Sequence, residues 1–230
     1  MRINADFSKP AVVVPRNEDW VCSPESGVDR LMLDRVGDEV ARATSIVRYA
    51  AGSSFSRHTH PKGEEFLVLE GVFSDESGDY PAGTYVRNPP GTGHAPHSEH
   101  GCRILVKLRQ FEPDDLEPVV INTNDVSAWT PVSDFETRLD LYTFRNEKVA
   151  MHRYVAGAEF HLGAAGGAEL FIVSGALIYE GKALKDECWL RLPDGESAMI
   201  IAMKETCLWL KTGHLDVDSE FSVLHTDNNF

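Results

Sequence analysis

The sequence predicts an all-β fold of two tandem antiparallel barrels of the jelly-roll, or double-stranded β-helix, type. Most segments between turn residues have strand length and are rich in Val, Ile, Leu, Tyr, Phe and Thr, as in 66–69, 103–108 and 208–211. Helical periodicity is almost absent. Many short strands separated by Gly and Pro are typical of antiparallel barrels, and 230 residues suffice for two of them.

An internal repeat predicts that the two barrels are related. Residues 47–52 match residues 152–157 at an offset of 105 (157 minus 52), and residues 65–71 match residues 169–175 at an offset of 104 (175 minus 71). Between the halves, 111–118 contains two prolines and four acidic residues, which disfavour regular structure. We therefore predict one domain over 1–116, with an N-terminal arm, and a second over 117–230.

Composition excludes several classes of partner. The formal net charge of −14 opposes binding to the phosphate backbone of nucleic acids and to anionic membrane surfaces. No segment has the roughly 18 consecutive apolar residues of a membrane helix, and the N-terminus does not resemble an export signal. The cysteines form no Cys-x-x-Cys pair, so we expect small buried side chains in a reducing cytoplasm: Cys22, Cys102, Cys188 and Cys207.

One constellation of side chains predicts a metal site. His58 and His60 are two residues apart, and alternate residues of a strand point to the same face. Glu64 follows four residues later, and His94 closes a second glycine-bounded segment. Three neutral imidazoles and one carboxylate suit Zn, Fe, Mn, Ni or Cu rather than Ca or Mg. We predict that these four side chains bind one divalent transition-metal ion in the N-terminal barrel.

Neighbouring polar residues leave two alternatives open. On a strand, Glu65 points away from Glu64, so we expect it to be a surface or inter-strand carboxylate. A hairpin one residue longer would make Glu65 the ligand instead. No catalytic residue is assigned, because four further polar residues could bind a proton or an anion but could equally lie in loops or at barrel ends: Tyr85, Arg87, His97 and His100.

The second half of the repeat lacks the imidazoles. Small residues stand in their place under the sequence alignment: Gly163 for His58, Ala165 for His60 and Ala198 for His94. Glu169 remains and matches either Glu64 or Glu65. A lone carboxylate does not hold a transition metal, so we expect a metal-free, structural second barrel. The vacated site is either a cavity or filled by large side chains, the candidates being Phe171, Trp189 and Trp209.

The two-part motif, Gly52-x5-His58-x-His60-x3-Glu64-x6-Gly71 followed by Gly83-x5-Pro89-x-Gly91-x2-His94, resembles the paired signature of the cupin superfamily. Over residues 40–110, and above all in 58–76 and 79–91, the sequence resembles the cupin domain of ChrR-type anti-sigma factors. This resemblance implies zinc bound by the four predicted ligands, and control of an extracytoplasmic-function sigma factor in the singlet-oxygen response. In that family, sigma binding belongs to a separate N-terminal helical domain with a His-x3-Cys-x2-Cys motif, which residues 1–19 do not contain.

The same pattern also resembles cupin dioxygenases that cleave diketones or hydroxylated acetophenones with Fe(II). Two hypotheses follow: a zinc-binding regulatory or sensing module, or an Fe-dependent dioxygenase, an oxidoreductase acting on a small carbonyl or phenolic substrate. Mn(II) is also compatible with the ligand set. The expected partners are a small-molecule ligand, a sigma factor by resemblance, and a second copy of the chain in a homodimer.

Overall fold

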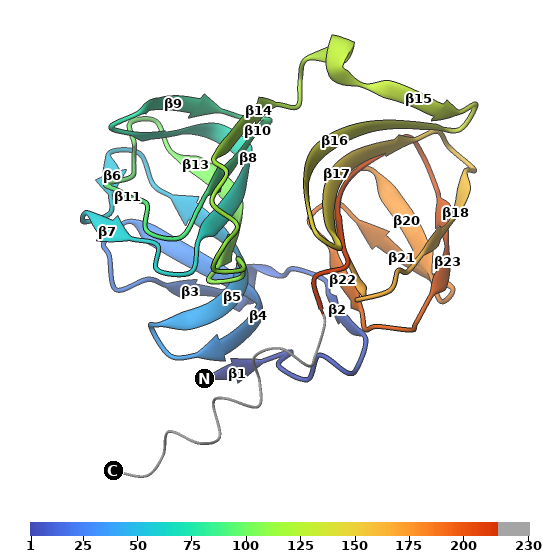
Figure 1. Cartoon of the computed structure of the whole chain (residues 1–230), viewed down its shortest axis with the longest axis horizontal. Helices are drawn as coiled ribbons and strands as arrows, with labels where there is room; N and C mark the ends of the chain where they lie inside the picture. Colours follow the sequence, from blue (N-terminus) through green and yellow to red (C-terminus); the bar gives the residue numbers. More distant parts are fainter. Residues whose placement is uncertain (216–230) are drawn as a thin grey trace. The chain divides into compact units, whose positions relative to one another are not determined.

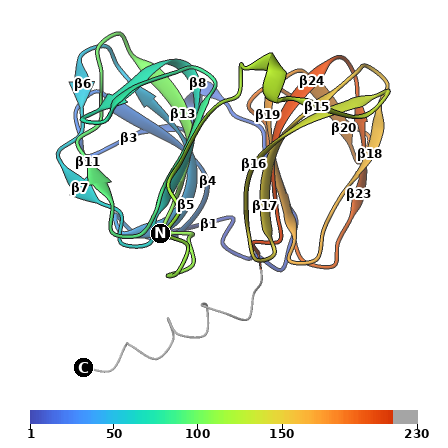
Figure 2. The ribbon, with the colours of Figure 1, turned by 45° about the horizontal axis from the view of Figure 1, so that its top comes forward.

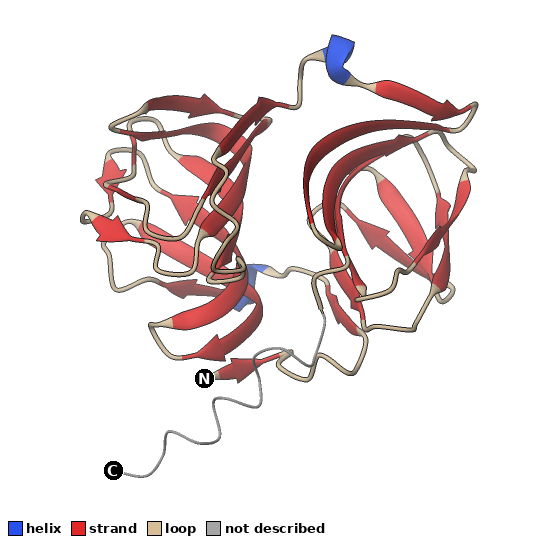
Figure 3. Ribbon diagram, viewed as in Figure 1, coloured by secondary structure: helices blue, strands red, loops and turns tan. Residues whose placement is uncertain are grey.

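The chain is built almost entirely from antiparallel strands, as the sequence predicts, and Figure 3 shows these strands in red. This architecture is that of a computed structural model, which describes residues 1–215. Its helices are two short 3-10 turns, η1 (Asn17–Asp19) and η2 (Val126–Ala128). Within residues 1–215, no helix is both long and apolar enough to cross a membrane.

Contacts group the chain into two compact units. Among the described residues, the first comprises Met1–Ala5 and Pro15–Ala128, and the second comprises Asp6–Val14 and 129–215. The division follows strand pairing: β14 (Val119–Asn122) pairs with β10 (Thr84–Asn88) and so falls in the first unit. That strand lies beyond residue 116, where the repeat predicted a boundary.

The first unit centres on an antiparallel sheet with the strand order β1-β4-β5-β13-β8-β10-β14, with β3, β6, β9 and β12 paired at its margins (Figure 1). A separate two-stranded sheet joins β7 to β11. The strands not yet defined are β1 (Arg2–Ile3), β3 (Trp20–Cys22), β4 (Val28–Gly37), β5 (Ala41–Tyr49), β6 (Ser53–Ser54), β7 (His58–Thr59), β8 (Glu64–Asp75), β9 (Gly78–Pro81), β11 (Gly93–His94), β12 (His97–Ser98) and β13 (Cys102–Leu108).

The second unit contains two antiparallel sheets, with the orders β15-β16-β17-β24-β19-β22-β2 and β18-β23-β20-β21 (Figure 2). Its strands are β2 (Ala11–Val13), β15 (Thr130–Ser133), β16 (Glu136–Phe144), β17 (Glu147–Tyr154), β18 (Glu159–Leu162), β19 (Ala168–Ser174), β20 (Ala176–Tyr179), β21 (Lys182–Lys185), β22 (Trp189–Leu192), β23 (Ala198–Ala202) and β24 (Thr206–Thr212).

Strand alternation sets the core of the first unit. In β8, Phe66 and Val68 face an apolar cluster that also contains Val47, Val86 and Ile104. Because side chains alternate along a strand, Glu64 lies on this inner face and Glu65 on the other. The motif glycines Gly52, Gly83 and Gly91 lie between strands, whereas Gly71 lies within β8; all four have positive φ.

The N-terminal arm supplies a strand to the second unit, which the sequence did not indicate. Strand β2 pairs with β22, and the Phe7 ring lies 4.1 Å from the Arg191 guanidinium carbon. The first unit has a matching arrangement, because β14 pairs with β10 and Phe111 lies 4.1 Å from the Arg87 guanidinium carbon. Each unit therefore carries an edge strand and an aromatic ring over a buried arginine, taken from different places in the sequence.

Candidate metal centre

Two short strands bring the predicted ligands together. Strands β7 and β11 pair so that His58 lies opposite His94. Gly93 allows this close approach, since a Cβ there would lie 2.5 Å from the carbonyl oxygen of His58. His60 follows β7 directly, and its backbone N–H donates to Thr92 O at 2.8 Å. The backbone of the second motif segment thus fixes the position of the first.

Glu64, and not Glu65, is the carboxylate of the cluster. Glu64 begins β8 on the inner face, where Asn88 Nδ2 donates to Glu64 Oε2 at 3.1 Å. Glu65 points the other way, accepting from Tyr85 OH at 2.7 Å and from Arg87 Nη1 at 2.8 Å. Glu65 is only 1% exposed, so of the two expected positions, surface or inter-strand, it takes the inter-strand one.

The four predicted ligands converge on one point. Their ligand atoms all lie within 4.8 Å of one another, so the cluster of His58, His60, Glu64 and His94 could hold a metal ion. Glu64 Oε2 lies 3.6 Å from His60 Nε2 and 3.4 Å from His94 Nε2. Among residues 1–215, neither of these buried Nε2 atoms has a hydrogen-bond partner.

Hydrogen bonds at the opposite ring nitrogens set the direction of each imidazole. Nδ1 of His58 is 3.0 Å from Ser56 O, and Nδ1 of His94 is 2.9 Å from Asp75 Oδ2. Nδ1 of His60 is 3.1 Å from Thr92 Oγ1, whose own proton goes to Pro89 O. With the proton on Nδ1, each Nε2 presents a lone pair to the centre, as in metal-binding histidines.

The Nε2 lone pairs and the Glu64 carboxylate thus lie close together. A cation bound between them would stabilise this arrangement. Burial lowers the pKa of His60 below its usual value, and the neighbouring His94 and His58 act in the same direction, whereas Glu64 opposes them. The neutral imidazole is the form that binds metals. The donor set and its protonation therefore fit a divalent transition metal.

Asp75 is the residue at this site that the sequence did not reveal. Its Oδ2 accepts from His94 Nδ1, while Oδ1 accepts from Tyr80 OH at 3.2 Å and from the backbone N–H of Ser77 at 2.7 Å. No spacing rule could identify it, because it lies eleven positions after Glu64 (75 minus 64) and meets His94 only through tertiary packing.

We expect Asp75→Asn to weaken metal affinity by about 10–100-fold, the usual effect of losing an outer carboxylate partner of a ligating histidine. Asparagine keeps the size of the side chain but removes the charge that stabilises His94. Competition with a chromogenic chelator measures the affinity. Asp79→Asn is a control, because Asp79 accepts from Ser74 Oγ rather than from a ligand. Equal affinities in the two variants would contradict this role for Asp75.

The remaining candidates lie elsewhere. His97 and His100 are exposed, and neither belongs to the cluster. Tyr85 and Arg87 donate hydrogen bonds to Glu65 on the opposite face of β8 from Glu64. Neither is an exposed residue at the barrel end, and neither belongs to the metal-ligand cluster. Of the four cysteines expected to be buried, Cys102 and Cys188 are buried and Cys207 is partly buried, but Cys22 is exposed on β3.

Strand pairing corrects the alignment of the second half. Leu162 lies opposite Ala198 as His58 lies opposite His94, so Leu162, and not Gly163, occupies the position of His58. The backbone bond from Gly167 N to Ala164 O repeats the bond from Gly63 N to His60 O, so Ala164, and not Ala165, replaces His60. Glu159 pairs with Ile201 as Ser54 pairs with His97, so the one-residue deletion lies between Glu159 and Leu162, within β18, where the alignment did not place it.

Cross-strand partners also settle the identity of Glu169. It lies opposite Arg191 and Lys211, as Glu65 lies opposite Arg87 and Lys107, so it matches Glu65. Ala168 then takes the place of Glu64. All four ligand positions of the first unit are therefore apolar in the second: Leu162, Ala164, Ala168 and Ala198.

The aromatic residues expected near the vacated site lie on another face. Leu162, Ala168 and Ala198 belong to or pack on the apolar core of the second unit. Phe171 follows Glu169 by two residues on β19, so the two side chains lie on the same face of the strand. Its cross-strand partners are Trp189 and Trp209, which lie on that face too. Phe171, Trp189 and Trp209 are therefore not part of the core cluster on which the positions equivalent to His58, Glu64 and His94 lie.

Comparison with known proteins finds a family match in the first half of the chain. A family model described as the ChrR cupin-like domain matches residues 8–112. No curated protein matches the chain.

Several solved structures share the fold. YlbA from Escherichia coli has a TM-score of 0.69 and 14% identity, covering 93% of this chain and 95% of that one. The Escherichia coli pirin YhhW, solved with nickel(II), has a TM-score of 0.66 and 14% identity, covering 87% and 97%. Salicylate 1,2-dioxygenase from Pseudoaminobacter salicylatoxidans, solved with gentisate, has a TM-score of 0.57 and 11% identity, covering 89% and 81%.

Proposed function

We propose that the first unit, most of which lies within the ChrR cupin-like match over residues 8–112, binds one divalent transition-metal ion, with zinc preferred over Fe(II) or Mn(II), and acts as a regulatory or sensing module. The observation that carries this proposal is the convergence of four ligand atoms within 4.8 Å, two of them buried imidazole nitrogens without hydrogen-bond partners among residues 1–215. His58, His60, Glu64 and His94 would hold the ion.

The chemistry of the donors favours zinc. Four protein ligands complete the tetrahedral coordination typical of non-catalytic zinc. The carboxylates of Glu64 and Asp75 would together balance a charge of +2, since each carries one negative charge within or beside the cluster. Two aromatic rings also lie beside the cluster, with Phe73 5.8 Å from His94 and Phe55 5.4 Å from His58, measured between ring centroids.

The regulatory part of the proposal rests on the ChrR-type match alone. The ChrR-type match suggests a sigma factor as the protein partner. In that family, however, the sigma factor is bound by an N-terminal domain with a His-x3-Cys-x2-Cys motif, and residues 1–19 lack this motif. A sensing role needs only that the metal site responds to an oxidant or small ligand. Affinity purification of the chain, followed by mass spectrometry, tests the partner. Recovery of a sigma factor would support anti-sigma activity.

An Fe-dependent dioxygenase is the second candidate, acting on a small diketone or a hydroxyacetophenone-like substrate. The observation in its favour is that His58 is only partly buried, whereas His60, Glu64 and His94 are buried, so the cluster approaches the surface on the side of His58. Iron with six coordination positions would leave two beyond the protein ligands for dioxygen and substrate.

One experiment separates the two candidates. The protein is purified without added metal and analysed for its elements, and the iron-loaded form is then screened for oxygen uptake with acetylacetone and 4-hydroxyacetophenone. We expect about one equivalent of zinc per chain and no uptake above that of the His60→Ala variant. Iron in the purified protein together with substrate-dependent uptake would overturn the regulatory proposal in favour of the enzyme.

A further inference from the structure

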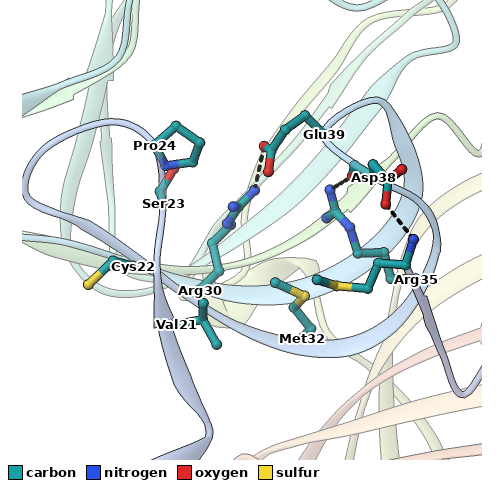
Figure 4. A pocket seen from close by; sticks show the side chains of 10 residues that line it. Val21, Cys22, Ser23, Pro24, Arg30, Met32, Arg35, Asp38 and Glu39 are labelled. Carbon is teal, nitrogen blue, oxygen red and sulfur yellow. Dashed lines mark hydrogen bonds and ion pairs between the residues drawn. The ribbon is translucent and has the colours of Figure 1, made fainter.

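A pocket of about 380 Å³ lies in the first unit, apart from the metal cluster (Figure 4). It shares no lining residue with the cluster. Strand β4 provides its floor, β3 and the following turn provide one wall, and the β4–β5 hairpin provides another. A volume of this size falls in the range of small-molecule sites, about 300–1,000 Å³.

A β-bulge turns two arginines into this pocket. Arg30 lies opposite Val47 and Met32 opposite Ser45, but after the register shift Arg35 lies opposite Ala43. Since Ala43, Ser45 and Val47 alternate along β5, Arg30, Met32 and Arg35 share one face of β4 despite their uneven spacing. Figure 4 shows both arginine side chains directed toward the hairpin residues Asp38 and Glu39.

The positive charges in this pocket are deep, and the negative charges are at its rim. Arg35 is 3% exposed, whereas the side chains of Asp38 and Glu39 are 90% and 69% exposed. Within residues 1–215, the guanidinium of Arg35 hydrogen-bonds to one acceptor, the backbone oxygen of Asp38, and has no carboxylate within ion-pair distance. Buried arginines are ordinarily paired with an anion.

Arg30 also has an unused hydrogen-bond donor in the same pocket. Its Nε is buried and has no hydrogen-bond partner among residues 1–215, and its Nη1 reaches the exposed Glu39 only at 3.4 Å. Burial lowers the pKa of Arg35, and the nearby positive charge of Arg30 acts in the same direction, whereas the carboxylates of Glu39 and Asp38 at the rim oppose them. Two guanidinium groups with unused donors therefore face a water-accessible volume that contains no buried acid.

We propose that this pocket binds a small carboxylate with an apolar body. Its two oxygens would accept from the guanidinium groups of Arg30 and Arg35, which suit the planar geometry of a carboxylate. The apolar body would lie against the side chains that line the rest of the pocket: Met1, Val21, Pro24 and Met32. This proposal is independent of the metal and of the function proposed for it.

Isothermal titration calorimetry of the full chain, as purified, tests this site with three probes: hexanoate, its neutral counterpart 1-hexanol, and inorganic phosphate. We expect saturable binding of hexanoate with one site per chain. 1-Hexanol lacks the charge that the arginines recognise, so it should bind at least about tenfold more weakly. Phosphate lacks the apolar body and should not displace hexanoate at equal concentration.

Two substitutions connect binding to the pocket. Arg35→Gln and Arg30→Gln should each weaken hexanoate binding by at least about tenfold, because a charged hydrogen bond is lost. Arg103→Gln is the matched control, since Arg103 pairs with Glu70 in the same unit and does not line the pocket. Arg30 is more exposed than Arg35, so its variant keeps the test valid if Arg35→Gln does not fold, which circular dichroism would reveal.

Three outcomes would overturn this inference. They are no saturable hexanoate binding at millimolar concentration, equal affinity for hexanoate and 1-hexanol, and an affinity unchanged in folded Arg30→Gln. Displacement of hexanoate by equimolar phosphate would contradict the apolar part of the ligand class.

Discussion

His94→Ala is expected to remove stoichiometric metal from the protein. His94 supplies one of the four ligand atoms, and its loss leaves Asp75 without the imidazole that it orients at 2.9 Å. It also removes the residue that β11 places opposite His58. The three remaining ligands do not complete a tetrahedral site, and the hydrogen bond between His94 and Asp75 is lost as well. Metal content should therefore fall from about one equivalent per chain to well below one. Elemental analysis after gel filtration measures it.

His97→Ala is the control for this experiment. His97 is an exposed histidine three residues further along the same segment and does not belong to the cluster, so its loss should leave metal content unchanged. Full metal occupancy in His94→Ala would show that the predicted ligand set is wrong. Equal losses in both variants would show that the segment, and not the ligand, was disturbed.

Glu169→Ala is expected to lower the free energy of unfolding of the second unit by about 3–5 kcal/mol, the cost of leaving buried charges uncompensated. Glu169 is fully buried and accepts from Trp189 Nε1 at 2.7 Å and from His214 Nε2 at 3.0 Å. It lies opposite Arg191 and Lys211, which are also fully buried. Alanine would remove the carboxylate from between these two cations.

Denaturant unfolding of the full chain, followed by tryptophan fluorescence, measures this effect. Trp189 and Trp209 are buried close to Glu169 in the sheet and report on its unfolding. Glu159→Ala, at an exposed position of β18, should change stability by less than about 0.5 kcal/mol. Metal bound per folded chain should be unchanged in Glu169→Ala. A loss of stability below about 1 kcal/mol would contradict the role of Glu169 in this cluster.

The cluster of His58, His60, Glu64 and His94, which could hold a metal ion, could be predicted from the sequence because local rules bring these residues together. His58 and His60 are separated by one residue, glycines bound both motif segments, and strand alternation separates Glu64 from Glu65. The all-β fold followed from short strand-like segments and the near absence of helical periodicity. These features depend on neighbours in the sequence, so one chain is enough to recognise them.

What the sequence did not reveal depends on pairing between distant segments. The correspondence of Leu162 with His58 and of Glu169 with Glu65 is visible only from cross-strand partners, since a one-residue deletion can be placed at several points of an alignment. Asp75 reaches His94 through packing, and β2 joins a sheet whose other strands begin 117 or more residues after β2 ends (130 minus 13). The bulge that groups Arg30 with Arg35 has no clear sequence signal either.

A crystal structure of the full chain, with diffraction data collected on both sides of the zinc absorption edge, tests the central claim most directly. We predict one anomalous peak in the first unit, at about 2.0–2.2 Å from Nε2 of His58, His60 and His94 and from a carboxylate oxygen of Glu64. A peak of the same kind among Leu162, Ala164, Ala168 and Ala198 is not expected. A map from metal-replete protein with no peak at the four predicted ligands would contradict the account.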